Sequence, residues 1–400
     1  MGKGLLGVAS AIAVLTLLSK GFGFFRELVV AAGFGAGVAK DAYTAAYIIP
    51  AFSLIMLGGL TGPFHTGAQK VMTAMRGRGE DEAVPGVMAT ILLAVTLIMG
   101  ALSVVAYFEA PWLIRLVASQ ASPDVFAMAV AQLRVMSPLV LIGGLVGILC
   151  GISNDRGDFT LPSLSPLIAS VAVIVAVLWR RGDPMALAWG TMLGGVGQLL
   201  LQAPAGVQLL RSGPIRWEFK HAEVHSLFWL LLPASISSTV GTLNVIIGTN
   251  FASALPKGQI GIFDYANKLI QLPLGILMTA LLIPVFPLLT QAVVAGDQDG
   301  LFRRLNQGIS TIALSTLPLI AVFVAAGRPI VAVMYQRGAF TSDATKLTYE
   351  VLAFAALGIF TYASRDMMIR VFYALDDSRT PLLVSLFSMG TTAAGMWLVI

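Results

Sequence analysis

The sequence predicts an all-α membrane protein that crosses the bilayer many times. Hydrophobic residues fill 57% of its 400 positions and charged residues only 11%, whereas a soluble domain carries about 25% charged residues. Apolar runs of about 20 residues, long enough to cross a hydrocarbon core of roughly 30 Å, recur along the whole chain. A transmembrane β-barrel would show segments of about ten alternating residues instead, and the sequence contains none. The composition therefore excludes a soluble protein.

Hydropathy places eleven helices along the chain. The apolar part of the first is too long for a cleaved signal peptide and runs into further membrane sequence, so we expect it to be retained. Segments 110–119 and 215–225 are predicted to be short interfacial pieces. The predicted helices span residues 5–33, 41–69, 84–108, 124–153, 160–180, 185–211, 226–252, 259–291, 303–327, 343–375 and 379–400.

The loops between these helices predict the orientation. With a cytoplasmic N-terminus, the terminus and the cytoplasmic loops hold eleven Lys and Arg residues, and the opposite loops, which include Lys40, hold eight. Cytoplasmic loops are normally the more basic ones, so the bias favours a cytoplasmic N-terminus. The last helix reaches Ile400 without a polar flank, and we therefore expect the C-terminus to be truncated.

Two pairs of segments indicate an internal repeat. "DAYTAAYIIP" (41–50) and "DYANKLIQLP" (264–273) both place Asp and Pro nine residues apart, at an offset of 223. "NDRGDFTLP" (154–162) resembles "LDDSRTP" (375–381), with an offset of 221 between Asp155 and Asp376. A unit of about 220 residues and six helices returns the chain to the same side of the membrane. The repeat predicts two parallel lobes, 1–213 (helices 1–6) and 214–400 (helices 7–11, incomplete), with substrate between them.

Charged residues lie inside the predicted membrane helices, beginning with "SKGFGFFREL" (19–28) in the first. A charge at a helix centre costs about 2.5–3.5 kcal/mol on insertion scales, so such residues usually face a bundle interior or a wet cavity. A cavity lined by cations suits an anionic substrate, above all a phosphate. The alternatives are cations that reach the membrane surface, or structural ion pairs such as Arg26–Glu27 and Arg365–Asp366. The cations are Lys20, Arg26, Arg134, Lys268, Arg365 and Arg370, and the acids are Glu27, Asp41, Asp264, Glu350 and Asp366.

Sequence signals for catalysis, cofactors and metals are missing. There is no G-x-x-x-x-G-K-[ST] phosphate loop and no H-E-x-x-H motif. The three histidines do not cluster with carboxylates or with the single cysteine, Cys150, and "GFGAG" (33–37) is predicted to be a tight turn between two helices. We therefore predict a protein that is not an enzyme and has no cofactor, no metal site and no nucleic acid partner.

Four segments together resemble the MurJ/MviN family of bacterial lipid II flippases. The first, from Ser19 to Pro50, is similar to the family pattern S-R-x-x-G-x-x-R-[DE] followed by F-G-A-G-x-x-x-D-A and a proline. "YANKLIQLPLGIL" (265–277) resembles Y-A-D-R-L-x-x-x-P-x-G, with Lys268 at the arginine position. "YQRGAFTSDAT" (335–345) and "FYALDDSRTP" (372–381) resemble later family segments, so the similarity covers essentially the whole chain.

The resemblance implies a fold and a transport activity. The fold is that of the multidrug/oligosaccharidyl-lipid/polysaccharide exporter superfamily, with two six-helix lobes and two further C-terminal helices. The implied activity is alternating-access movement of lipid II, an undecaprenyl-diphosphate-linked glycan, across the bacterial cytoplasmic membrane, among membrane lipids and in company with cell-wall synthesis proteins. Carried over to this chain, Lys20, Arg26 and Lys268 contact the diphosphate, and Glu27 and Asp41 are functional acids. Less specific cavity candidates are Arg134, Asp264, Arg365 and Arg370.

Departures from the family pattern keep alternatives open. Lys20 and Lys268 replace arginines, Asn267 replaces an aspartate, and the stretch "FSLIMLGGLTGPF" (52–64) has no charge where the family has "LRRxxAEGA". The alternative substrates are another lipid-linked oligosaccharide or an organic cation, although a cation exporter would depend on buried carboxylates rather than on an excess of cations. A scaffold in a cell-wall or division complex, or a membrane-embedded glycosyltransferase, is the alternative from another functional class.

Overall fold

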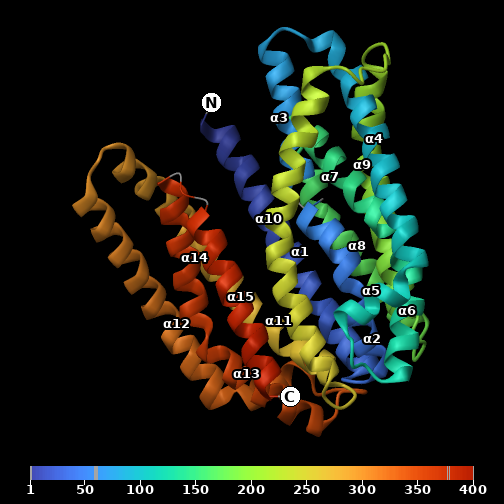
Figure 1. The fold of residues 1–400 in the computed structure, drawn as a ribbon, viewed down its shortest axis with the longest axis vertical. Helices are drawn as coiled ribbons and strands as arrows, with labels where there is room; N and C mark the ends of the chain where they lie inside the picture. Colours follow the sequence, from blue (N-terminus) through green and yellow to red (C-terminus); the bar gives the residue numbers. More distant parts are fainter. Residues whose placement is uncertain (1, 58–61, 376, 378, 400) are drawn as a thin grey trace. The chain divides into compact units, whose positions relative to one another are not determined.

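The computed structural model describes residues 2–57, 62–375, 377 and 379–399, and this part of the chain contains helices and no strand (Figure 1). The predicted all-α class is therefore confirmed. The helices form two compact units, Met1–Gly258 and Gln259–Ile400. This division follows packing contacts, and it does not test the predicted lobes, which rest on the sequence repeat.

The helices of the first unit correspond to the first seven predicted ones. The predicted helix 41–69 is divided into three pieces and the predicted helix 124–153 into two, and segment 110–119 contains a short helix. In chain order the unit holds α1 (Gly2–Phe34), α2 (Val38–Ala51), the π-helix η1 (Phe52–Leu57), α3 (Pro63–Gly77), the 3₁₀ turn η2 (Asp81–Ala83), α4 (Val84–Phe108), α5 (Ala110–Val117), α6 (Pro123–Met136), α7 (Leu139–Asp155), α8 (Thr160–Trp179), α9 (Ala186–Arg211) and α10 (Ala222–Ser253).

A proline explains the division of the fourth predicted helix. Pro138 lies between α6 and α7 and has no N–H to continue the hydrogen-bond ladder. The two helices are bent by 40° at this break. Ser103 of α4 donates a hydrogen bond to the carbonyl of Ser137 (2.9 Å), so a side chain compensates one backbone group at the break.

Small residues bring the helices of the first unit close together. A Cβ atom on Gly194 of α9 would lie 2.8 Å from the Cα of Ala169 on α8, and a Cβ on Gly190 would lie 2.8 Å from Val173. Close backbone approach through small residues is the main way in which membrane helices gain packing energy. α8 in turn packs against α1, and α7 against α3, α4 and α9, so α1 is held on the outside of a layer of apolar helices.

Polar contacts join the loops at one end of the first unit. Arg78, after α3, pairs with Glu223 at the start of α10 (2.8 Å), and Arg76 pairs with Asp155 at the end of α7 (2.9 Å). The interfacial piece predicted over 215–225 has no helix up to residue 221, and its residues 222–225 begin α10. The segment is fixed at this end because Glu218 N–H donates to Thr90 (2.9 Å).

The other end of the first unit collects the remaining loops. Lys257, after α10, pairs with Asp124 at the start of α6 (2.5 Å), and Gln132 of α6 donates to the carbonyl of Pro184 before α9 (2.7 Å). α10 therefore runs from one end of the unit to the other, packed against α3 and α5 (Figure 1).

The second unit contains α11 (Gln259–Val294), α12 (Gln298–Tyr335), α13 (Ser342–Leu357), α14 (Ile359–Ala374) and α15 (Arg379–Val399). α11 packs against α12, α13 and α14. Buried rings of Tyr265, Tyr335 and Phe340 form its aromatic centre, with ring centroids 4.9–5.6 Å apart. The side chain of Thr341 accepts the N–H of Ala344 (3.2 Å) and so caps α13.

Several of these helices are long and apolar enough to cross a membrane. Among the described residues, three meet the requirement individually: the helix Asp81–Phe108, the helix Thr160–Trp179 and the helix Gln298–Tyr335. The bent pairs α6–α7 and α13–α14 (43° between the two helices of the second pair) meet it as combined spans. This is fewer than the eleven spans predicted from hydropathy, although each predicted span is helical in the described part of the chain.

Candidate functional site

The charged stretch of the first predicted helix lies within α1 and forms a buried ion pair. Glu27 is only 5% exposed, and one of its oxygens, Oε1, accepts both Nε (3.1 Å) and Nη2 (2.7 Å) of the neighbouring Arg26. The Arg26 side chain is 20% exposed. Arg26 and Glu27 therefore form the ion pair that the sequence suggested, and part of the Arg26 side chain is left uncovered.

Lys40 is the residue of this site that the sequence reasoning missed. It was assigned to a loop, but the structure places it in the first turn of α2 with its side chain fully buried. Its Nζ lies 3.6 Å from Oε2 of Glu27 and 5.8 Å from the ring centroid of Tyr43. The signal that could have identified it is a pair of opposite charges on the two sides of a tight turn between apolar helices.

The predicted turn in "GFGAG" explains how Lys40 reaches Glu27. α1 ends at Phe34, Gly35 adopts a positive φ of 56°, and α2 begins at Val38. Glycine occupies this left-handed region without the steric cost of a Cβ atom. The chain therefore turns within three residues, and the turn brings Lys40 close to Glu27.

Two tyrosines and a threonine hold α2 in place beside the ion pair. The rings of Tyr43 and Tyr47 stack with centroids 5.4 Å apart, and Tyr43 Oη lies 2.8 Å from Oγ1 of Thr191 on α9. The Thr191 hydroxyl donates its single proton to the carbonyl of Leu187 (2.7 Å), so Tyr43 is the donor in the contact between the two side chains.

Asp41 has a structural partner in the loop that follows α10. Its Oδ2 accepts the backbone N–H of Gly258 (2.5 Å). Gly258 has a φ of 98°, and a Cβ atom there would lie 2.5 Å from the carbonyl oxygen of Ala36. The α1–α2 turn and this loop are therefore packed backbone to backbone, with Asp41 holding them together. Its expected role as a functional acid stays a prediction.

The other predicted cations of the first unit lie apart from this cluster. Lys20 is exposed and precedes Arg26 by six residues, which is about 9 Å along a helix. Arg134 on α6 is also exposed, and its guanidinium lies 5.7 Å from the ring centroid of Tyr107. The structure thus brings together Arg26, Glu27 and Lys40, and leaves Lys20 and Arg134 outside.

The predicted residues of the second unit are found on α11 and α14. Lys268 pairs with Asp264 one turn earlier (2.8 Å), and their side chains are 27% and 22% exposed. Arg365 lies over the ring of Tyr362 at 5.9 Å, and Arg370 is half-buried on the same helix. Lys268 and Asp264 therefore repeat, in the second unit, the pattern of a membrane cation paired with a carboxylate.

The uncharged stretch after Pro50 begins with the π-helix η1. Residues 58–61 of this stretch lie outside the described residues, and so does Asp376 of the predicted repeat. Ser53 donates to the carbonyl of Val140 on α7 (2.7 Å). A Cβ atom on Gly143 would lie 2.7 Å from the backbone of Ser53, so η1 lies directly against α7. A π-turn inside a helix frequently marks a functional position.

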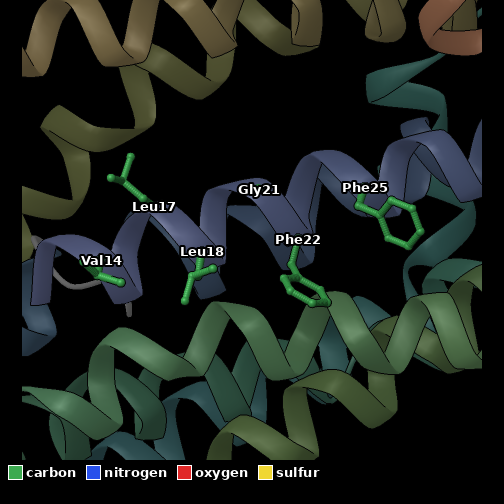
Figure 2. A pocket seen from close by; sticks show the side chains of 6 residues that line it. All are labelled: Val14, Leu17, Leu18, Gly21, Phe22 and Phe25. Atoms are coloured by element: carbon green, nitrogen blue, oxygen red, sulfur yellow. The ribbon is translucent and has the colours of Figure 1, made fainter. Parts of the chain in front are cut away.

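An apolar groove follows the uncovered face of α1. The cavity has a volume of about 610 Å³, and Figure 2 shows that its lining side chains come from successive turns of this one helix. Arg26 is the next residue after the last lining residue, Phe25, so α1 carries an apolar surface and a paired cation in sequence. The lining residues are Val14, Leu17, Leu18, Gly21, Phe22 and Phe25.

Metal ligands do not gather in the described part of the chain. No group of three His, Cys, Asp or Glu side chains is arranged to hold an ion there. His65 is instead hydrogen-bonded to Asn154 (2.7 Å), and Cys150 is buried in α7. The chemistry of the site is therefore that of paired cations and carboxylates in an apolar surrounding.

Comparison with known proteins identifies similar sequences along nearly the whole chain. Residues 30–400 match the family described as "Lipid II flippase MurJ". A "Probable lipid II flippase MurJ" from Synechocystis sp. is 36% identical over 405 residues, which cover 97% of this chain and 74% of the relative. A "Lipid II flippase MurJ" from Burkholderia cenocepacia is 28% identical, with 93% of this chain and 73% of the relative covered.

Solved structures show the same fold. A lipid II flippase MurJ in an inward closed conformation has a TM-score of 0.78 at 23% identity, covering 94% of this chain and 78% of that one. An inward-facing multidrug resistance MATE family transporter of the MOP superfamily has a TM-score of 0.69 at 13% identity, covering 97% of this chain and 98% of that one. At these identities the structural likeness establishes the fold alone.

Proposed function

Because the chain belongs to the lipid II flippase MurJ family, we propose that it moves lipid II from the inner to the outer leaflet of the bacterial cytoplasmic membrane by alternating access. It acts as a transporter and not as an enzyme. The N-terminus lies in the cytoplasm, and the proteins expected to act before and after it are those that make lipid II and those that consume it in the cell wall.

One observation on the molecule supports the proposal most directly: α1 presents a partly uncovered Arg26 next to an apolar groove. Lipid II is an amphiphile that joins a diphosphate and a glycan to a long hydrocarbon chain. A guanidinium recognises phosphate oxygens with two parallel hydrogen bonds, and the apolar surface beside it suits a hydrocarbon. An organic cation would be repelled by the same guanidinium.

We propose Arg26, Lys268 and Lys20 as the cations that contact the diphosphate. Arg26 and Lys268 share the features expected of such groups. Each lies on a membrane helix, each is paired with a carboxylate, and their side chains are 20% and 27% exposed. Lys20 is proposed because of its position in the family pattern and its exposure on α1.

The test is rescue of a bacterium depleted of its own lipid II flippase. We expect the wild-type chain to restore growth and to make lipid II accessible at the outer leaflet. An Arg26→Ala/Lys268→Ala variant should reach the membrane at a normal level and fail to rescue, because it lacks one proposed diphosphate contact in each unit.

The matched control removes two lysines, one from each unit, that are more than half exposed: Lys257→Ala/Lys346→Ala. This variant should rescue like the wild type. Rescue by the Arg26→Ala/Lys268→Ala variant would refute the proposed cation site, and failure of a well-expressed wild-type chain would refute lipid II as the substrate.

A further inference from the structure

The segment 214–221, between α9 and α10, presents apolar side chains at one end of the first unit. Ile215, Trp217 and Phe219 are 49%, 57% and 53% exposed. We propose that this segment is a lipid-binding surface, which holds anionic phospholipid headgroups of the membrane that the chain spans. The site goes beyond the proposed transport of lipid II, because it involves no transported molecule.

The apolar side chains of this segment lie on one side of it. Residues 214–218 form neither a helix nor a turn, and in an extended chain side chains two residues apart point the same way. The rings of Trp217 and Phe219 accordingly stack, with their centroids 6.2 Å apart. By the same alternation Ile215 belongs to the side of these rings, and the charged residues between them belong to the other.

The backbone of the segment is fixed against α4. The N–H of Glu218 donates to Oγ1 of Thr90 (2.9 Å), and a Cβ atom on Gly86 would lie 2.6 Å from the carbonyl oxygen of Arg216. Gly86 and Thr90 are one helical turn apart, so the segment runs along the first turns of α4. Its exposed rings are therefore held on an ordered backbone, which lowers the entropy lost on binding.

Its position along α4 corresponds to the surface of a membrane. The helix Asp81–Phe108 is long and apolar enough to cross a bilayer, and the segment contacts its beginning. The exposed apolar side chains of this helix begin at Leu97, 63% exposed, roughly 10 Å along the axis from Thr90. Trp229, two turns into α10, is 73% exposed. Aromatic side chains at the end of a span are typical of the headgroup layer.

Exposed cations accompany the rings and decide which lipids fit. Arg216 and Lys220 lie on either side of the ring pair in sequence, and Arg211 ends α9; all three are exposed. Glu218 is the only acid in residues 214–221, so the segment carries a positive charge. Each Lys or Arg near an anionic membrane surface strengthens the attraction about fivefold, which corresponds to about 1 kcal/mol. An anionic headgroup is therefore favoured over a zwitterionic one.

The test measures which lipids surround the segment. Purified full-length Ile215→Cys protein carries a fluorophore on the new cysteine, while the native Cys150, 3% exposed, stays unlabelled. In phosphatidylcholine nanodiscs, added phosphatidylglycerol with a doxyl quencher near its headgroup should quench the fluorophore more strongly than phosphatidylcholine with the same quencher. The expected preference is at least about fivefold, the effect of a single cation. Arg216→Gln/Lys220→Gln should abolish this preference.

Two control variants separate charge at this segment from other effects. Arg216→Lys/Lys220→Arg keeps both charges and should keep the preference, whereas a purely structural role of these side chains predicts its loss. Arg180→Gln/Arg181→Gln removes two exposed cations between α8 and α9 and should also keep it. Equal quenching by both lipids without these substitutions would overturn the anionic preference, and so would a preference that survives Arg216→Gln/Lys220→Gln.

The rings are tested with the same fluorophore. Trp217→Ala/Phe219→Ala should lower quenching by both lipids by about twofold or more, because the aromatic side chains hold the segment in the headgroup layer. Unchanged quenching would overturn the role of the rings. A fluorophore that neither lipid quenches in the protein with intact rings would show that another part of the protein covers the segment, and this result would overturn the lipid-binding surface as a whole.

Discussion

Arg26 and Glu27 show how a single residue pair can combine stability with access. An unpaired charge at the centre of a membrane helix costs about 2.5–3.5 kcal/mol on insertion scales, and the neighbouring carboxylate offsets part of this cost through two charge-assisted hydrogen bonds. The pairing uses only one edge of the guanidinium. The remaining N–H groups of Arg26 can therefore still bind an anion, so an ion pair and a substrate contact are compatible roles.

Gly258 is the residue at which we expect a substitution to be most damaging to the first unit. Its φ of 98° is unfavourable for any residue with a Cβ, and the added atom would lie 2.5 Å from the Ala36 carbonyl oxygen. A positive φ alone costs a residue with a Cβ roughly 1–2 kcal/mol. Gly258→Ala should lower the free energy of unfolding by more than this, because the added atom also meets the Ala36 carbonyl oxygen. The measurement is the melting temperature of the purified protein.

Gly182→Ala is the matched control, because Gly182 also has a positive φ (81°) but its added Cβ would meet no atom within 4 Å. It should lower the melting temperature less than Gly258→Ala does. Equal effects would mean that the close approach between the α1–α2 turn and the loop after α10 contributes nothing to stability.

The residues of the site differ in how far the sequence could predict them. Arg26 and Glu27 were identifiable because charge is rare in an apolar run. Lys40 was not, because the second helix was predicted to begin at residue 41 and begins at Val38 in the structure, and helix ends are the least certain part of such a prediction. The contact of Tyr43 with Thr191 joins residues 148 positions apart, and no local pattern indicates it.

At the scale of elements, a helix that hydropathy predicts as continuous can be divided in the structure. The predicted helix 41–69 contains α2, η1 and α3, because Pro50 removes a backbone donor and Ser53 gains the carbonyl of Val140 as a partner instead. In the second unit, three residues of the segment "YQRGAFTSDAT" have structural roles. Tyr335 and Phe340 bury their rings, and Thr341 caps α13. Tyr335 and Phe340 therefore belong to the buried core of the second unit.

The connection between α3 and α10 has a predictable pH dependence. Arg78 pairs with Glu80 (3.1 Å) as well as with Glu223 (2.8 Å), and hydrogen bonds from Arg78 lower the pKa of the exposed Glu80 carboxyl below its usual 4.5. A carboxyl whose pKa is lower in the folded state stabilises the fold above its unfolded pKa, and this contribution is lost as the pH falls through the folded pKa. The effect is small because solvent and salt screen an exposed pair.

We therefore expect Glu80→Gln to lower the melting temperature slightly at pH 7, and the difference from the wild type to disappear as the pH falls below 4.5. The comparison is made at several pH values on both sides of 4.5. Glu82→Gln controls for net charge, since it removes the same charge two residues along the chain. A constant difference between Glu80→Gln and the wild type at all pH values would contradict the prediction.

At the scale of the whole molecule, the order of the helices was predictable from the sequence, whereas their packing contacts were not. Hydropathy alone gives the order of the apolar helices, because each must satisfy its backbone hydrogen bonds within itself in lipid. Which helices pack together depends on contacts such as Gly194 against Ala169, and these have no signature at the level of composition. The contacts of α10 with α3, α5, η1, α2 and α4 are another example.

The sequence predicts the orientation of the molecule in the membrane from one signal, the uneven distribution of Lys and Arg between the two sets of loops. In the structure Lys40, one of the eight basic residues counted in the opposite loops, is buried in α2. Cysteine labelling can test the orientation with little background, since the single native cysteine, Cys150, is 3% exposed. Lys220 and Arg181 are exposed residues of loops at opposite ends of the first unit.

In spheroplasts, a membrane-impermeant maleimide should therefore label Arg181→Cys at once and Lys220→Cys only after permeabilisation, while the unsubstituted protein stays unlabelled in both conditions. The reverse pattern would place the N-terminus outside the cell. It would also reverse the direction of the proposed transport relative to the loops, because the end formed by the α3–α4 and α9–α10 loops would then face outward. Labelling of both positions before permeabilisation would show that residues 181 and 220 lie on one side, which an odd number of membrane crossings between them forbids.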